Sequence, residues 1–131
     1  MILQYFRKKE NEYKKIADDI YVSIVSESKK LINSNFFKEK TFNTSFEIIS
    51  IILVLYFRNL KKNNMPNETK IKDELIKNFI NDLDISLREI GIGDMSIGKY
   101  VKKYVKKFYY RVKIIDPILE NFKEEKLAEY L

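Results

Sequence analysis

The amino-acid sequence predicts an all-α fold: a single-domain bundle of about five helices around a central apolar helix. The chain has only three Gly and two Pro in 131 residues, which leaves room for long helices and little for the many turns of a β-sandwich. Its 45% hydrophobic and 14% aromatic content is typical of a globular chain and too high for a disordered one. No segment shows the alternation of a strand. We expect one domain over residues 1–131, with residues 1–11 as a segment that can be flexible.

The first predicted helix covers residues 12–32. Its charged side chains lie opposite apolar ones that recur every three or four residues, namely Tyr13, Ile16, Ala17, Ile20, Ile24 and Leu31. An Asn-Ser-Asn stretch ends this helix. Phe36 and Phe37 then begin a loop that we expect to fold back on the core.

The second predicted helix contains the longest apolar stretch of the chain, residues 48–57. A membrane-spanning helix needs about 20 residues, so this stretch is interpreted as a buried core helix. Thr44 or Ser45 can cap the start of the helix, and Lys61 and Lys62 suit the negative end of its dipole. This helix is expected to lie at the centre of the bundle.

The third predicted helix covers residues 68–90 and follows a turn rich in Asn with one Pro. Gly91 stands where a left-handed residue commonly ends a helix. The side chains expected to be buried are Ile71, Leu75, Ile76, Phe79, Ile80, Leu83, Leu87 and Ile90.

Two more helices are predicted toward the C-terminus. A fourth helix, capped by Asp94 or Ser96, runs to about residue 115. Asp116 followed by Pro117 predicts a new helix start, because Asp caps helices and Pro favours the first helical position. The fifth helix is expected to bury Leu119, Phe122, Leu127 and Leu131.

The amino-acid inventory excludes most enzyme chemistry. The chain has no Cys, which removes disulfides, thiolate metal sites and cysteine nucleophiles, and no His, which removes the commonest general base and metal ligand. Asp82, Glu89 and Asp94 lack the regular spacing of a divalent-cation site. These three acids are the group left for a carboxylate enzyme, which stays open as an alternative, and we expect no cofactor, no metal and no small-molecule substrate.

The positive charge of the chain is concentrated in the fourth predicted helix. Residues 99–113 contain seven basic side chains and no acid, and the rest of the chain has a net charge of −1 (18 basic against 19 acidic residues). One stripe of this helix is apolar, and the opposite face is basic, with Lys99, Lys102, Lys103, Lys106, Lys107, Tyr110 and Lys113. Such a face is either merely solvated or binds anionic lipid, nucleic-acid phosphate or an acidic partner. Because six like charges on one face repel one another, we favour a binding surface.

Arginine is used at only four positions, against 21 for lysine. Its planar guanidinium makes bidentate contacts that lysine cannot make. Arg88 has Asp84 one helical turn earlier and Asp94 close by, so a local ion network is one interpretation and contact with a partner is the other. The candidate partner-binding residues are Arg58, Asp84, Arg88, Asp94 and Arg111.

Residues 82–94, Asp-Leu-Asp-Ile-Ser-Leu-Arg-Glu-Ile-Gly-Ile-Gly-Asp, resemble the signature of the ubiquinol–cytochrome c chaperone family. The resemblance covers roughly residues 13–120, and Ile52 stands where many relatives have His. Further matches follow in order: Phe46-Glu47, Arg58 and Leu60, Ile97-Gly98-Lys99, Val101-Lys102, and Phe108-Tyr109 with Arg111. Three of the four arginines fall on arginines of the family pattern.

This resemblance implies a non-enzymatic assembly chaperone that binds nascent or unassembled cytochrome b and assists assembly of the ubiquinol–cytochrome c reductase, respiratory complex III. The family works in mitochondria with a small partner protein and near the ribosomal exit. The basic face would then contact the ribosome or the anionic inner membrane. The expected location is the cytoplasm, peripherally at the inner membrane, or the matrix side in a mitochondrion. The alternative is a basic helical adaptor that binds RNA, the ribosome or an anionic membrane without a chaperone role.

Overall fold

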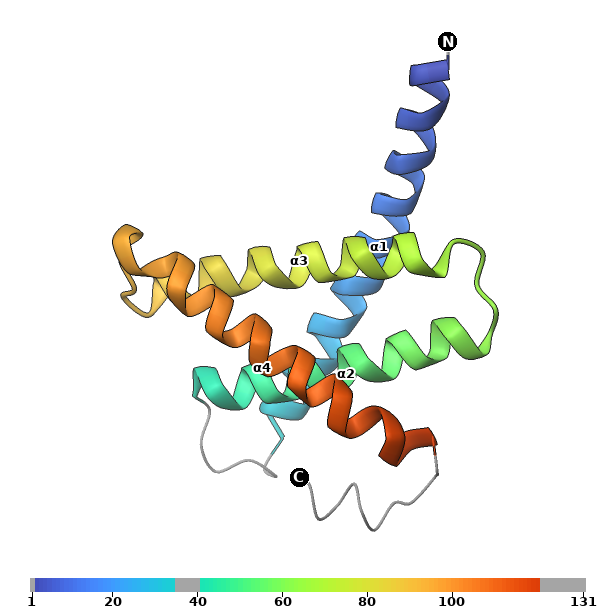
Figure 1. Ribbon diagram of the computed structural model, residues 1–131. Coiled ribbons are helices and arrows are strands. Elements are labelled where there is room, and N and C mark those ends of the chain that lie inside the picture. The colour runs from blue at the N-terminus through green and yellow to red at the C-terminus, as the bar shows by residue number, and fades with distance from the viewer. Residues whose placement is uncertain (1, 35–40, 121–131) are drawn as a thin grey trace.

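The computed structural model describes residues 2–34 and 41–120, which form four helices (Figure 1). α1 spans Ile2–Ile32, α2 spans Phe42–Lys62, α3 spans Glu68–Glu89 and α4 spans Asp94–Glu120. The all-α prediction is confirmed, with four helices where about five were expected. The expectations for Phe36, Phe37, Phe122, Leu127 and Leu131 lie outside the described residues, as does the side chain of Leu119.

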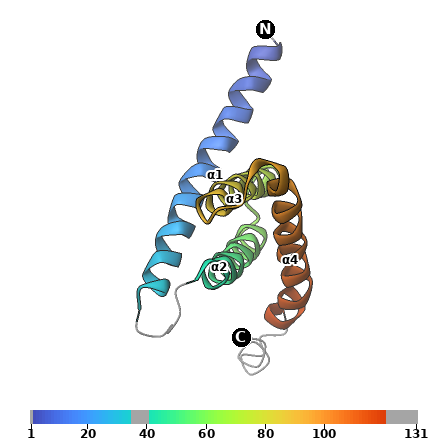
Figure 2. The ribbon, with the colours of Figure 1, turned by 90° about the vertical axis from the view of Figure 1, so that its left-hand side faces the viewer.

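The helices form three layers. α2 and α3 run antiparallel in the middle layer, α1 crosses one face of this pair, and α4 covers the opposite face (Figures 1 and 2). α1 therefore packs on α2 and α3, and so does α4. The first turns of α1 project beyond the other three helices (Figure 1).

The core forms where the apolar faces of the four helices meet, and α2 supplies more of its buried side chains than any other described helix, as its apolar run predicts. Leu53 and Val54 of α2, Leu75 of α3, Ile24 of α1 and Phe108 of α4 are almost completely buried. Within α2, the buried Ser50 donates its hydroxyl to the carbonyl of residue 46 at 2.7 Å, which satisfies a polar group that would otherwise be costly to bury. The predicted apolar helix thus lies in the middle layer, which it shares with α3, and its apolar run is largely buried, except that Leu55 is 45% exposed contrary to the prediction.

Both of the first two helices begin earlier than predicted. α1 begins at Ile2 rather than near residue 12, because the first turns contain no Gly or Pro that would interrupt a helix. α2 is capped by Thr41 rather than by Thr44 or Ser45. The Thr41 hydroxyl oxygen accepts the backbone N–H of Thr44 at 3.3 Å, the bond expected of an N-cap three residues before its partner.

The predicted new helix at Pro117 is wrong, because α4 continues through this residue to Glu120. Proline removes one backbone hydrogen bond, but here it lies in the last turn of the helix, where little of the helix remains to be disrupted. The side chain of Asp116 is also not free to cap a helix. Its carboxylate accepts a hydrogen bond from Arg58 at 2.8 Å, and its carbonyl accepts another from the same guanidinium at 3.1 Å.

The connection from α3 to α4 is as tight as the sequence indicates. Gly91 has φ +106°, the left-handed conformation predicted for the residue that ends a helix. The carbonyl of Gly93 accepts the N–H of Ile97 at 3.0 Å, so α4 starts at Asp94 and neither Asp94 nor Ser96 is its cap. Ile90 is 59% exposed, and Leu31 on α1 is also exposed, contrary to the predicted burial of both.

None of the helices in the described part of the chain is both long and apolar enough to span a membrane.

Candidate binding surfaces

The outer face of α4 is basic along most of its length. All six lysines predicted to share this face are exposed, namely Lys99, Lys102, Lys103, Lys106, Lys107 and Lys113. Within residues 2–34 and 41–120, none of these lysines forms an ion pair. The Lys107 ammonium group lies 5.0 Å from the centre of the Tyr104 ring. We call these lysines and the exposed tyrosines among them the basic face.

Three tyrosines are exposed on the basic face or at its edges, where the sequence analysis identified one. Tyr110 is 60% exposed, as predicted, and Tyr109 and Tyr100 are 52% and 37% exposed. At 100° per residue, Tyr109 and Tyr100 lie at opposite edges of the lysine arc, and this helical placement was the signal that could have identified them. Tyrosines in this position can lie at the headgroup level of a membrane or stack on bases.

The opposite face of α4 packs against the bundle as predicted. Ile97, Phe108 and Ile115 are buried on it. The Phe108 ring lies edge-on to Phe57 of α2 at 6.2 Å between centroids and tilted against Phe79 of α3 at 5.0 Å. The apolar stripe therefore explains why α4 covers both α2 and α3.

Arg58 and Arg111 connect α4 to α2. The Arg111 guanidinium makes a bidentate contact with the Glu47 carboxylate, in which Nε donates to one oxygen at 2.8 Å and a terminal nitrogen donates to the other. Nearer the end of α4, Arg58 donates to Asp116. In both pairs the two residues are more than fifty positions apart in the sequence, which is why neither pairing could be predicted from local spacing.

Arg88 forms the local ion network that its neighbours indicate. Its Nε donates to the Asp84 carboxylate at 2.6 Å, and a terminal nitrogen donates to Asp94. These hydrogen bonds to Asp84 and Asp94 raise the pKa of the Arg88 guanidinium above its ordinary value. The network is exposed at the turn between α3 and α4, and Asp94 is its most exposed member.

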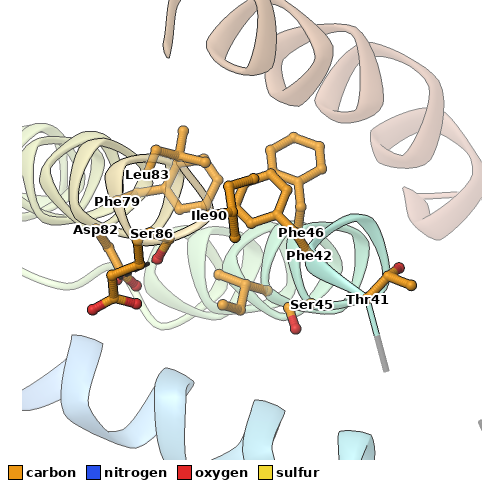
Figure 3. A pocket seen from close by; sticks show the side chains of 11 residues that line it. Thr41, Phe42, Ser45, Phe46, Phe79, Asp82, Leu83, Ser86 and Ile90 are labelled. Atoms are coloured by element: carbon orange, nitrogen blue, oxygen red, sulfur yellow. Dashed lines mark hydrogen bonds between the residues drawn. The ribbon is translucent and has the colours of Figure 1, made fainter. Parts of the chain in front are cut away.

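A cleft of about 240 Å³ lies between the start of α2 and the end of α3 (Figure 3). Six apolar side chains line it, together with two acids and three hydroxyl-bearing residues: Phe42, Phe46, Ile49, Phe79, Leu83, Ile90, Asp82, Glu89, Thr41, Ser45 and Ser86. The cleft could not be predicted from the sequence, because its two walls are about forty residues apart in the chain.

Both walls of the cleft are fixed by other helices. On the side of α4, the Tyr104 ring packs edge-on against Phe42 and Phe46, with 5.0 Å between centroids in each case. On the side of α1, the Tyr21 hydroxyl donates to the Asp82 carboxylate at 2.7 Å. Burial of Tyr21, and then its hydrogen bond to Asp82, raise the pKa of the Tyr21 phenol well above its ordinary value. Tyr21 therefore stays protonated and continues to donate to Asp82 at neutral pH.

No cluster of three or more acidic, His or Cys side chains suitable for a metal ion occurs in the part of the chain that the structure describes. Asp82, Glu89 and Asp94, which lie close together in the sequence, are divided between two places. Asp82 and Glu89 line the cleft, and Asp94 pairs with Arg88.

A family model described as ubiquinol-cytochrome C chaperone matches residues 35–131. The matched region contains α2, α3 and α4, and with them the cleft, the three paired arginines and the basic face. No curated protein and no solved structure matches the chain.

Proposed function

The chain belongs to the ubiquinol–cytochrome c chaperone family, and we propose that it is a non-enzymatic chaperone that binds newly made cytochrome b and assists its assembly into respiratory complex III. The family match over residues 35–131 is the observation that carries this proposal. The surfaces fit a binding role: an apolar cleft, an exposed ion network and a basic face occur on one small bundle.

The basic face is proposed to contact the anionic surface of the inner membrane. Exposed lysines attract anionic headgroups, and tyrosines are enriched at the level of those headgroups. The protein would then act in the cytoplasm, or on the matrix side in a mitochondrion, as a peripheral membrane protein. The ribosome is the alternative target, because tyrosines between lysines also suit RNA. A small partner protein could bind as well. Contact through the basic face would leave the cleft, which lies on the inner side of α4, accessible to this partner or to the client.

The ion network of Asp84, Arg88 and Asp94 is proposed to contact the client directly. It lies at the exposed turn between α3 and α4, where a partner's carboxylate or backbone can approach the guanidinium. Arg58 and Arg111 would contribute by positioning α4, since both connect it to α2.

Co-purification from respiring cells tests this function. The tagged protein should carry unassembled cytochrome b with it, and Arg88→Lys should carry less while keeping its circular dichroism spectrum, because lysine cannot make the bidentate contact. The control is Lys77→Arg, which exchanges the cationic side chain of another ion pair on the same helix. Equal recovery of cytochrome b with Arg88→Lys and with the unchanged protein would show that the network is only a local ion pair.

A basic adaptor without a chaperone role is the second candidate, and the basic face favours it. This candidate predicts that the protein binds anionic vesicles or ribosomes while no cytochrome b accompanies it. The chaperone proposal fails if that is the result.

A further inference from the structure

The charge of the cleft lining is opposite in sign to the net charge of the chain. The protein contains 25 basic residues and has a net charge of +6. Among the described residues that line the cleft, however, two are acids and none is basic. The cleft is thus an apolar and acidic site on a basic protein.

Glu89 is the acid of the cleft for which the described residues provide no ion-pair or hydrogen-bond partner. Its neighbour Arg88 pairs with Asp84 and Asp94, whereas Glu89 takes part in no ion pair among residues 2–34 and 41–120. Glu89 is also the last residue of α3, where the negative end of the helix dipole disfavours a carboxylate. A cation placed at this end of the cleft would be attracted by the Glu89 carboxylate and by the helix terminus together.

An exposed apolar side chain lies next to this carboxylate. Ile90 is 59% exposed and lines the cleft with the half-buried Phe42 and Ile49. Figure 3 shows Phe42, Phe46, Phe79, Leu83 and Ile90 gathered in the space between α2 and α3. At about 240 Å³ the cleft is smaller than the roughly 300–1,000 Å³ typical of small-molecule sites. It therefore suits one or two apolar side chains of a peptide better than a cofactor.

We propose that the cleft between α2 and α3 binds an apolar peptide segment that carries a Lys or Arg at its edge, the chemistry found where a membrane-spanning segment meets its cationic flank. Apolar side chains of the segment enter between Phe42, Ile49 and Ile90, and the cation pairs with Glu89, since Asp82, the other acid of the lining, already accepts a hydrogen bond from Tyr21. Because Tyr104 and Tyr21 fix the two walls, the cleft is preformed for this occupant. The inference rests on the proposed chaperone function, and it names the part of a client that this site recognises.

Two synthetic peptides test the inference by fluorescence anisotropy with the full chain. Both are labelled, rich in leucine and alanine, and identical except that one ends in Lys-Lys and the other in Glu-Glu. A protein with a net charge of +6 would bind the acidic peptide better if the attraction were nonspecific. The cleft predicts the opposite order, with the basic peptide bound about tenfold more tightly.

Variants of the cleft locate the binding. Glu89→Gln should weaken the basic peptide about fivefold and leave the acidic peptide unchanged or stronger, while Asp73→Asn, which removes an exposed acid elsewhere on α3, should change neither. Ile90→Gln should weaken both peptides, and it should fold normally because its side chain is mostly exposed. Equal or tighter binding of the acidic peptide, or equal effects of Glu89→Gln and Asp73→Asn, would overturn the inference.

The outcome is distinguishable from failure of the proposed function. Peptide binding needs neither complex III nor a cell, so it can succeed where cytochrome b fails to co-purify. In that case the cleft recognises another protein with this chemistry and the chaperone proposal fails. If cytochrome b co-purifies while both peptides bind equally, the client uses another surface and only the cleft inference fails.

Discussion

The two faces of α4 use their aromatic and basic side chains in different ways. On the inner face, Phe108 is 1% exposed and packs against Phe57 and Phe79, and Arg111 makes a bidentate pair with Glu47. On the outer face, Tyr110 is exposed, and the lysines form no ion pair within the described residues. The inner face connects α4 to the bundle, and the outer face is left for contact with something else.

The difference explains the choice between arginine and lysine in this chain. A guanidinium donates several hydrogen bonds in a fixed geometry, and both pairs that join α4 to α2 use this: Arg111 bonds both carboxylate oxygens of Glu47, and Arg58 bonds the carboxylate and the carbonyl of Asp116. Lysine is a strongly hydrated point charge, which suits a surface that attracts anions without a fixed geometry. Substitutions on the inner face should therefore change stability, and substitutions on the outer face should change binding.

The largest expected effect comes from Phe108→Ala. Removing this ring from its contacts with Phe57 and Phe79 should lower the free energy of unfolding by about 3–5 kcal/mol. Tyr110→Ala, two residues further along the same helix, is the matched control and should change it by about 0.5 kcal/mol or less. Urea unfolding followed by circular dichroism measures both. Similar costs for the two variants would mean that α4 does not have one buried and one exposed face.

A smaller effect is expected for the pair between Glu47 and Arg111. A double-mutant cycle with Glu47→Gln and Arg111→Lys should give a coupling energy of about 1 kcal/mol, the upper end for partly exposed ion pairs. The cycle is needed because Arg111 has further contacts, which a single substitution would also disturb. A coupling near zero would mean that the pair of Glu47 and Arg111 does not contribute to holding α4 on α2.

The sequence predicted the parts of this molecule that depend on local periodicity. The apolar run of α2, the bounds of α3, the left-handed Gly91 and the two faces of α4 all follow from the spacing of side chains along one helix. The ion network of Arg88 was also predictable, because its partners lie within six residues.

The features that the sequence did not predict depend on contacts between distant helices. Asp116 and Pro117 have the chemistry of a helix start, but Arg58, 58 residues earlier, engages the carboxylate that would cap it. The pairing of Arg111 with Glu47 and the cleft between α2 and α3 likewise require knowing which helices are neighbours. Spacing along a single helix carries no information about these contacts.

The smallest effect on stability, and the largest on binding, is expected for the outer face of α4. The variant replaces four of its lysines by glutamine, namely Lys102, Lys103, Lys106 and Lys107. It should unfold with nearly the same free energy as the unchanged protein, because these side chains are exposed and repel one another. Its binding to anionic vesicles should fall strongly, since each basic residue near an anionic membrane contributes about 1 kcal/mol. Vesicle co-sedimentation across a salt series measures the loss.

A variant of equal net charge separates the face from the charge of the whole chain. The control replaces four exposed lysines of α1 and α2 by glutamine, namely Lys14, Lys15, Lys61 and Lys62. It removes the same number of positive charges and leaves the basic face intact. This control should bind vesicles almost as the unchanged protein does. The same three proteins measured with purified ribosomes test the alternative target, because a loss confined to ribosomes would identify the ribosome as the target of the face. If the variant with the altered basic face and the control bind equally on both surfaces, then the lysines of α4 are merely solvated, and their number reflects only the lysine-rich composition of the chain.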